Sequence, residues 1–246
     1  MKKVALVTGG SSGIGKAISF ELAKNKISVG LTYSENKKGA IQVVNHIRNK
    51  GGIADAYNLK VENRYSVVNA IKYFSKNLGP INILVNNAGI SQFKNFKSIS
   101  DSDWNKIMNI NLRGAFICSQ ETLPYMLSQK WGRIINIASI GGIWGGVNQV
   151  HYAVSKAGMI GLTKSLANLY GEKNVNTNAI APGLVRTDMI KKELKKNINK
   201  NIIKKIPIGR IAEPKEIAKL VMHLVSDSGS YINGQTININ GGMYIG

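Results

Sequence analysis

The sequence predicts a seven-stranded, doubly wound parallel α/β sheet with helices on both faces. Short β-branched segments alternate along the chain with amphipathic helical patterns, and a glycine-rich turn separates the first strand from the first helix. Such alternation requires parallel strands joined by right-handed crossovers, which place helices on both faces of the sheet. With 246 residues, 43% of them hydrophobic, the chain can bury a sizeable core. We therefore expect one domain over residues 1–246.

The expected elements alternate from one end of the chain to the other. Each strand is a short β-branched run bounded by turn residues. Strands are expected over residues 4–7, 27–33, 53–59, 81–85, 133–138, 175–180 and 236–239. Helices are expected over residues 16–24, 37–50, 64–78, 101–127, 152–170 and 214–225. The segment 184–207 breaks the alternation, and its length predicts an insertion over the ligand crevice, a substrate lid.

Composition excludes several classes of protein. No apolar run approaches the ~18 residues of a membrane span, and the first strand begins almost at once, which leaves no room for a signal peptide. We expect a cytoplasmic protein that does not associate with membranes. Cys118 is the only cysteine and the three histidines are scattered, so no metal site is expected.

The chain is strongly basic, with a formal net charge of +20 at pH 7. An excess of this size attracts acidic partners and can also cause non-specific adhesion to nucleic acid. We expect no nucleic-acid partner, because the sequence has no recognisable binding module and no basic stripe interleaved with aromatic residues. Either an acidic protein partner or a general drift toward Lys, Asn and Ile accounts for the charge.

The glycine-rich turn Thr8-Gly-Gly-Ser-Ser-Gly-Ile-Gly15 follows the first expected strand and leads into a helix. A turn of this kind presents backbone N–H groups and the positive end of a helix dipole to an anion. The spacing of Gly9, Gly13 and Gly15 departs from the usual Gly-x-Gly-x-x-Gly pattern. Its place at the first strand-to-helix turn nevertheless predicts a site for the pyrophosphate of a dinucleotide.

Three residues in the middle of the chain have the chemistry needed to protonate a carbonyl. Tyr152 and Lys156 are four residues apart in an expected helix and so lie on one face, although an ordinary helix face gives the same spacing. A nearby ammonium should lower the pKa of the Tyr152 phenol from its ordinary value of ~10, making it a better proton donor at neutral pH. Ser139 ends an expected strand, where open α/β sheets bind their ligands.

Over almost its whole length the sequence resembles the short-chain dehydrogenase/reductase family, which implies a Rossmann-type fold. Besides the glycine-rich turn and the Ser139, Tyr152 and Lys156 set, the motifs are Asn86-Asn-Ala-Gly89, Asn111 in Asn-Ile-Asn-Leu, and Pro182-Gly183 followed by Thr187. Within the family the chain is most similar to the 3-oxoacyl-acyl-carrier-protein reductases of fatty-acid synthesis. That similarity rests on Leu84–Ile90, Ala181-Pro-Gly183 with Thr187-Asp-Met189, Ile206-Pro-Ile-Gly-Arg210 and Asn240-Gly-Gly-Met-Tyr244.

The resemblance implies NADPH-dependent reduction of a 3-oxoacyl thioester carried by acyl carrier protein. Tyr152 would donate the proton, Ser139 would hold the carbonyl, Lys156 would lower the tyrosine pKa and bind the nicotinamide ribose, and Asn111 would hold a water of the proton relay. Gln149 would join Ser139 and Tyr152 at the substrate. The residues implied to bind NADPH or NADP+ are Gly9, Ser11, Ser12, Gly13, Ile14, Gly15, Tyr33, Ser34, Lys60, Val61, Asn87, Ala88, Gly89, Tyr152, Lys156, Pro182, Gly183, Val185 and Thr187.

The choice between NADP and NAD is read at the end of the second expected strand. Residues 32–34 are neutral and Lys37 follows, which favours NADP because an NAD site usually places an acidic residue against the ribose 2′-hydroxyl. Glu35 lies close by, and Ser12 stands where NADP-dependent relatives often have arginine. Lys60 stands where the family usually has Asp or Asn facing the adenine.

The resemblance also implies partners. Lys130 and Lys173 fall where the subfamily has basic residues that dock the acidic acyl carrier protein, and the expected assembly is a homotetramer. The segments 91–96 and 143–149, which should line the substrate pocket, look least like a carrier-protein reductase. His151 is expected either to line that pocket or only to begin a helix.

Two other functions stay open. The first is reduction or oxidation of a different ketone–alcohol pair, such as acetoacetyl-coenzyme A, a sugar or a polyol. The second is a dinucleotide sensor without catalytic activity. A sensor has no need of a proton donor, so the intact Asn111, Ser139, Tyr152 and Lys156 set favours an enzyme.

Overall fold

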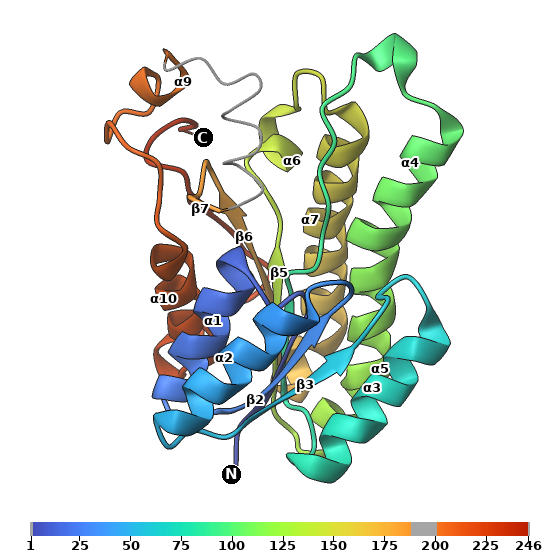
Figure 1. Cartoon of the computed structure of the whole chain (residues 1–246), viewed down its shortest axis with the longest axis vertical. Coiled ribbons are helices and arrows are strands. Elements are labelled where there is room, and N and C mark those ends of the chain that lie inside the picture. Colours follow the sequence, from blue (N-terminus) through green and yellow to red (C-terminus); the bar gives the residue numbers. More distant parts are fainter. Residues whose placement is uncertain (1, 188–200, 246) are drawn as a thin grey trace.

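The computed structural model describes residues 2–187 and 201–245, and within them one seven-stranded sheet runs through the molecule. The strand order is β3-β2-β1-β4-β5-β6-β7, and every neighbouring pair is parallel (Figure 1). The strands are β1 (Val4–Val7), β2 (Ser28–Tyr33), β3 (Ala54–Asn58), β4 (Ile83–Asn86), β5 (Gly132–Ile137), β6 (Val175–Pro182) and β7 (Thr236–Ile239). The predicted fold class is confirmed.

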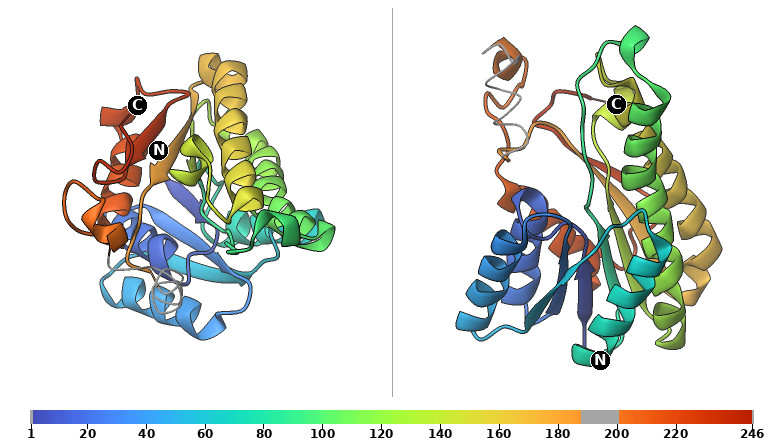
Figure 2. Two further views of the ribbon diagram at one scale, coloured as in Figure 1. Left: turned by 90° about the horizontal axis from the view of Figure 1, so that it is seen from above. Right: turned by 45° about the vertical axis from the view of Figure 1, so that its right-hand side comes forward.

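Helices cover both faces of this sheet, as the views from the front and from above show (Figures 1 and 2). One face carries α1, α2 and α10, and the other carries α3, α5 and α7. The helices are α1 (Gly13–Lys24), α2 (Lys37–Asn49), α3 (Arg64–Asn77), α4 (Asp101–Met108), α5 (Gly114–Ser128), α6 (Gly141–Trp144), α7 (Val150–Tyr170), α9 (Asn201–Lys204) and α10 (Pro214–Val225).

The hydrophobic core forms two layers, one on each face of the sheet. Successive side chains of a strand point to opposite faces, so Leu6 packs in the layer under α3 and α5, whereas Val7 packs in the layer under α1 and α10. All four residues of β1 are buried. Burial on both faces explains why the strands appear in the sequence as continuous apolar runs rather than as alternating patterns.

The helix expected over 101–127 differs from the prediction in its middle. The structure has α4, then a π-helical turn at Asn109–Arg113, then α5, which continues to Ser128. Helical propensity carries no signature of the extra residue in a π turn, and such turns occur frequently at functional sites. The short helix α6 was also not predicted, and α7 begins at Val150, two residues before the expected start.

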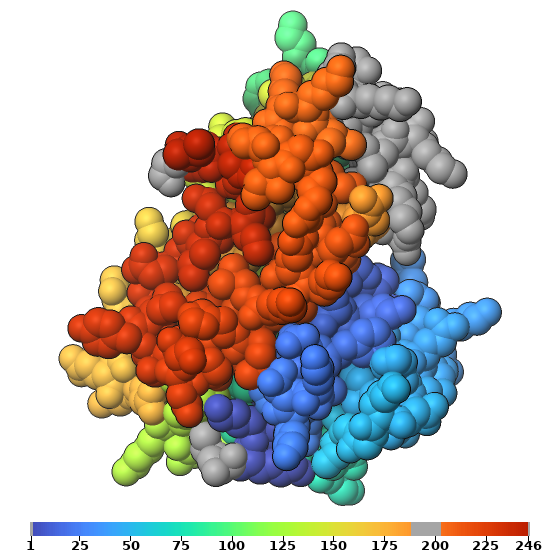
Figure 3. Space-filling view, turned by 90° about the vertical axis from the view of Figure 1, so that its left-hand side faces the viewer, coloured from blue at the N-terminus to red at the C-terminus, as the bar shows by residue number. Residues whose placement is uncertain are grey.

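Two further features concern the periphery. In the predicted substrate lid over 184–207, residues 188–200 lie outside the described residues; on its flanks, Val185 forms a parallel bridge with Ala212. The segments before and within α10, together with the C-terminal residues, cover the side of the molecule shown in orange and red in Figure 3. No helix among the described residues is long and apolar enough to cross a membrane.

Candidate active site

The carboxyl-terminal ends of six neighbouring strands open into one cleft of ≈ 790 Å³. Its walls come mainly from the segments that follow β1, β2, β3, β4, β5 and β6. Strand order reverses between β1 and β4, because the chain builds outward from β1 toward β3 and then from β4 toward β7. Open α/β sheets bind ligands at such a switch point, where the loops diverge and leave a crevice.

The turn after β1 has the backbone shape that its glycines allow. Gly9 and Gly13 have φ values of 64° and 53°, in the region that residues with a Cβ rarely adopt. A Cβ at Gly15 would lie 2.4 Å from the carbonyl oxygen of Gly9, so the third glycine lets helix α1 pack against the turn. The N-cap residue Ser12 makes no side-chain capping bond, so first-turn N–H groups of α1 remain available to an anion. This geometry fits a pyrophosphate.

The turns after β1 and β4 are fastened to each other. The Thr8 hydroxyl accepts hydrogen bonds from the backbone N–H groups of Asn87 and Ala88, each at 3.0 Å. In return the Asn87 side-chain amide donates to the carbonyl oxygens of Thr8 at 2.9 Å and Gly9 at 3.2 Å. The Asn-Asn-Ala-Gly motif therefore holds the two sides of the switch point at a fixed separation.

Ser139 and Tyr152 face each other across the cleft floor. Ser139 follows β5, its hydroxyl accepts from the N–H of Gly141 at 3.1 Å, and it also hydrogen-bonds the Tyr152 phenol. Burial raises the pKa of Tyr152 above 10.0, and the hydrogen bond with Ser139 offsets only part of that rise. The expected lowering of this pKa is wrong for the structure, because desolvation outweighs the interactions that favour phenolate. The phenol is a protonated donor at neutral pH.

Lys156 is buried beneath the tyrosine and points toward the sheet. Its Nζ donates to the carbonyl oxygen of Ile137 at 2.7 Å and lies 5.8 Å from the centroid of the Tyr152 ring. Burial lowers the pKa of Lys156 from 10.5 to about 8. The ammonium is therefore still mostly charged at neutral pH, although its pKa lies only slightly above that pH.

Asn111 lies in the π-helical turn behind the cleft. Its amide Nδ2 donates to the carbonyl oxygen of Ile90 and to the Ser155 hydroxyl, both at 3.0 Å, and its Oδ1 accepts from the N–H of Ile90 at 2.8 Å. Gly89 separates Asn111 from Lys156, since a Cβ there would lie 3.2 Å from the Asn111 oxygen and 3.5 Å from the Lys156 nitrogen. Asn111 does not line the cleft itself, but it holds the segment that does.

Most of the predicted site residues come together in this cleft. Besides Asn111, two more do not line it: Gly15, which is a packing residue beneath the turn, and Gln149, which precedes α7 at its N-cap. Gln149 does not line this cleft, and its contact with a substrate stays a prediction. The predicted residues that line the cleft are Gly9, Ser11, Ser12, Gly13, Ile14, Tyr33, Ser34, Lys60, Val61, Asn87, Ala88, Gly89, Ser139, Tyr152, Lys156, Pro182, Gly183, Val185 and Thr187.

Lys130 and Lys173 lie away from the cleft of their own chain. Both are exposed, one just before β5 and the other just before β6, and the side-chain amide of Asn174 connects their turns by donating to the Lys130 oxygen at 3.2 Å. Because the strands are parallel, their amino-terminal ends all lie on the side of the molecule opposite the cleft, which lies at their carboxyl-terminal ends. The two lysines therefore lie on connected turns, away from the cleft of their own chain.

Several cleft residues escaped the sequence analysis. Asp103 and Lys106 reach the cleft from α4, whereas Gln92 reaches it from the segment 91–96, which was expected to line the substrate pocket. Asp103 also completes a capping box with Ser100, which in the sequence looks like an ordinary helix start. His151, by contrast, is fully buried and bonds to Gln92. A single sequence carries no signal for such long-range side-chain pairing.

The described residues contain no group of three or more His, Cys, Asp or Glu side chains that could hold a metal ion. Cys118 is buried in α5, and burial raises the pKa of its thiol to about 12. The thiol is therefore protonated and packs as a small apolar group.

Comparison with known proteins points to the same kind of enzyme as the geometry of the cleft. Residues 3–198 match the family described as short chain dehydrogenase. A protein of Aquifex aeolicus named 3-oxoacyl-acyl-carrier-protein reductase FabG is 41% identical over 98% of this chain and 97% of its own. Proteins of the same name from Thermotoga maritima and Staphylococcus epidermidis are 37% and 39% identical, covering 99% and 100% of this chain and 98% and 100% of their own. The chain belongs to the short-chain dehydrogenase family and is an oxidoreductase that acts on ketone and alcohol groups.

Proposed function

We propose that this protein reduces 3-oxoacyl thioesters on acyl carrier protein to 3-hydroxyacyl thioesters, using NADPH, in fatty-acid synthesis. The names of its full-length relatives support the substrate. The observation that carries the proposal is the protonated Tyr152 phenol, hydrogen-bonded to Ser139 and placed in the same cleft as a pyrophosphate-shaped turn. A ketone bound there would meet a proton donor next to a dinucleotide.

Each residue of the site has a distinct task in this reaction. Ser139 would hold the ketone oxygen by a hydrogen bond, and Tyr152 would transfer its phenolic proton to that oxygen as a general acid. The charged Lys156 would stabilise the phenolate that remains. Asn111 would keep the wall of the cleft in place through its bonds to Ile90. NADPH supplies the hydride to the ketone carbon when bound, so the protein provides orientation and electrostatics.

The far end of the cleft would hold the adenosine half of NADPH. Tyr33 and Ser34 line it without a negative charge, which suits a 2′-phosphate, whereas Glu35 lines the same region and opposes it. Lys60 is exposed at the rim and offers a positive charge. We infer a preference for NADPH over NADH that is limited by Glu35.

The decisive assay follows the oxidation of NADPH with acetoacetyl groups carried by acyl carrier protein or by coenzyme A. The proposal expects turnover with NADPH, slower turnover with NADH, and a higher kcat/KM for the carrier-linked substrate. Equal kcat/KM for both thioesters would favour a reductase of coenzyme-A esters. No turnover with either thioester, but activity on a sugar or polyol, would refute the proposed substrate.

We also propose that Lys130 and Lys173 dock the acidic carrier protein. Because they lie at the amino-terminal ends of the strands, opposite the cleft, a carrier bound there would have to serve the cleft of another subunit. This agrees with the homotetramer that the family resemblance implies. Lys130→Glu with Lys173→Glu should raise KM for the carrier-linked substrate alone. The matched control, Lys24→Glu with Lys50→Glu, makes the same charge change at other exposed positions. Light scattering tests the tetramer. A cytoplasmic location stays a prediction.

A further inference from the structure

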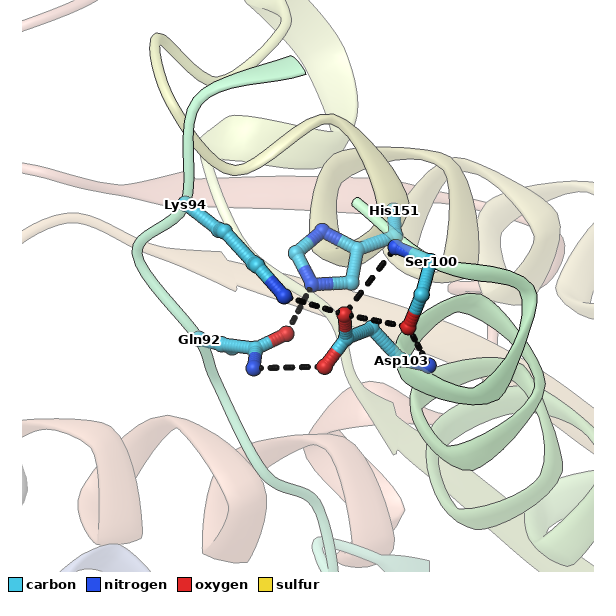
Figure 4. A network of polar contacts seen from close by, with 5 residues as sticks. All are labelled: Gln92, Lys94, Ser100, Asp103 and His151. Atoms are coloured by element: carbon cyan, nitrogen blue, oxygen red, sulfur yellow. Dashed lines mark hydrogen bonds and ion pairs between the residues drawn. The ribbon is translucent and has the colours of Figure 1, made fainter. Parts of the chain in front are cut away.

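A hydrogen-bonded network outside the family motifs joins three segments beside the cleft (Figure 4). Gln92 lies in the segment after β4, Asp103 in the first turn of α4, and His151 in the first turn of α7. The Gln92 side-chain oxygen lies 2.7 Å from His151 Nε2, and the Gln92 nitrogen donates to Asp103 Oδ1 at 2.8 Å. Gln92 and Asp103 line the cleft. A glutamine side chain is therefore held at both atoms of its amide in the wall that also contains Tyr152.

Chemistry fixes the direction in which the Gln92 amide faces. Hydrogen bonds from Lys94, Ser100 and Gln92 lower the pKa of Asp103, so this carboxyl is ionised at neutral pH and can only accept. The amide nitrogen of Gln92 must therefore face Asp103, and the amide oxygen must face His151. It follows that His151 donates through Nε2 and carries its proton there.

His151 makes this bond at a cost to stability. Its side chain is 0% exposed, and its Nδ1 has no hydrogen-bond partner in the described part of the chain. Burial lowers the pKa of His151, with the Asp103 charge opposing and the Lys94 charge assisting that change, so the ring is neutral and Nδ1 is a bare acceptor. A buried acceptor without a partner is destabilising, because it has lost its hydrogen bonds to water. A purely apolar residue would avoid that cost, so stability alone does not account for this histidine.

His151 and Asp103 act as a clamp on the Gln92 amide, and this clamp leaves one N–H donor of the amide free. A glutamine amide has two N–H groups, and Gln92 donates one of them to Asp103. None of the described residues accepts the other. The second N–H is thus held in place by a fixed side chain in the wall of the cleft, where a ligand can accept it.

We propose that Gln92 is a substrate-binding residue whose free amide N–H donates to the second carbonyl oxygen of the substrate, and that His151 and Asp103 are the positioning residues that hold it. The proposal rests on the function proposed above. In a 3-oxoacyl thioester the ketone at Ser139 and Tyr152 is separated by one carbon from the thioester carbonyl, which needs a donor of its own. The clamped Gln92 supplies one, and it selects substrates with a second carbonyl near the ketone.

The test uses Gln92→Met, which keeps the length of the side chain and removes both donors. With an acetoacetyl thioester we expect KM to rise about five- to tenfold with little change in kcat, because the bond is made equally in the ground and transition states. A thioether ketone that lacks the thioester oxygen should change by less than about twofold. The dissociation constant for NADPH should not change. Gln42→Met, on the exposed side of α2, is the matched control.

His151→Phe examines the clamp, because it releases the Gln92 oxygen and keeps a buried ring. We expect the same selective effect on the thioester, smaller in size, with rescue by His151→Gln, which keeps a donor. An unchanged KM for the thioester in Gln92→Met would overturn the assignment, and so would an equal loss on both ketones. If the wild-type protein reduces no 3-oxoacyl thioester, the proposed function fails first and this assignment fails with it.

Discussion

The two ends of the cleft are built in different ways. The dinucleotide end is made of main chain: a glycine turn, the amino end of α1, and the backbone N–H groups that Thr8 fastens. The substrate end is made of side chains that meet from distant segments, above all Gln92, Asp103 and His151. Main-chain sites require particular residues at fixed spacing, whereas a side-chain network can be assembled from many residue combinations. The first kind of site therefore has a sequence motif, whereas the network of Gln92, Asp103 and His151 does not.

Tyr152→Phe separates the two ends most sharply. Loss of the phenolic proton donor should lower kcat about 10²- to 10⁴-fold, because general acid catalysis contributes that much. NADPH binding, measured by the fluorescence of the nicotinamide, should remain near that of the wild-type protein. A variant that keeps its ketone reductase activity would show that another group donates the proton, and one that loses NADPH binding would show that the ends are not separable.

Gly15→Ala should damage the dinucleotide end. A Cβ there would lie 2.4 Å from the Gly9 oxygen and 2.5 Å from the Asn87 amide nitrogen, so the turn and its fastening must shift. We expect a loss of about 1–3 kcal/mol in the free energy of unfolding, as for other overpacked sites, and weaker NADPH binding by calorimetry. Gly161→Ala is the control, since no described atom outside its own stretch of helix would lie within 4 Å of a Cβ there. Equal effects of both changes would contradict the packing argument.

Lys156→Met tests the residue shared by both ends through the pH dependence of stability. The folded-state pKa of Lys156, about 8, lies below its ordinary value of 10.5, so the unfolded chain binds more protons between these pH values and wild-type stability rises there with pH. The methionine variant lacks this rise. Its melting temperature relative to wild type should therefore be highest below pH 8 and should fall by a few degrees as the pH approaches 10.5. A constant difference would mean that the buried amine is not a strained cation.

Glu35→Lys should have the smallest effect, at the rim of the dinucleotide end. Glu35 is exposed and lines the region expected to hold a 2′-phosphate, so reversal of its charge should tighten NADPH binding by about threefold, a surface-charge effect that salt weakens. NADH binding should change less. Glu172→Lys makes the same change on the turn before β6, away from the cleft. Tighter NADH binding in Glu35→Lys would place the 2′-phosphate elsewhere.

The sequence predicted the fold and the dinucleotide end well, for a physical reason. Short, continuous apolar runs such as Val4–Val7, bounded by turn residues, are typical of strands buried on both faces, and the glycines at 9 and 13 have positive φ values. Ser139, Tyr152 and Lys156 gathered as expected because strand ends and helix spacing place them. The direction of the Tyr152 pKa was wrong, since charge spacing is visible in a sequence but the extent of desolvation is not.

Two other predictions depend on contacts between distant segments. Gln149 was expected at the substrate; in the structure it lies at the N-cap of α7 and does not line the cleft, and its contact with a substrate stays a prediction. Lys130 and Lys173 were expected to dock a carrier protein; their positions before β5 and β6 place them at the end of the strands opposite the cleft, and the docking stays a prediction. In each case the topology, rather than the residue type, determines the surroundings.

The π-helical turn at Asn109–Arg113 has a consequence for how the long α4–α5 unit can change. Asn111 pairs with both main-chain groups of Ile90, much as a residue of a neighbouring strand would. These two hydrogen bonds fix the rotation of the helix about its axis relative to the wall of the cleft. Removal of a single residue from the turn would restore regular helical bonding and rotate one half of the unit by about 100° relative to the other. The Asn111 amide would then point away from Ile90, so a more regular helix would lower the activity of the enzyme.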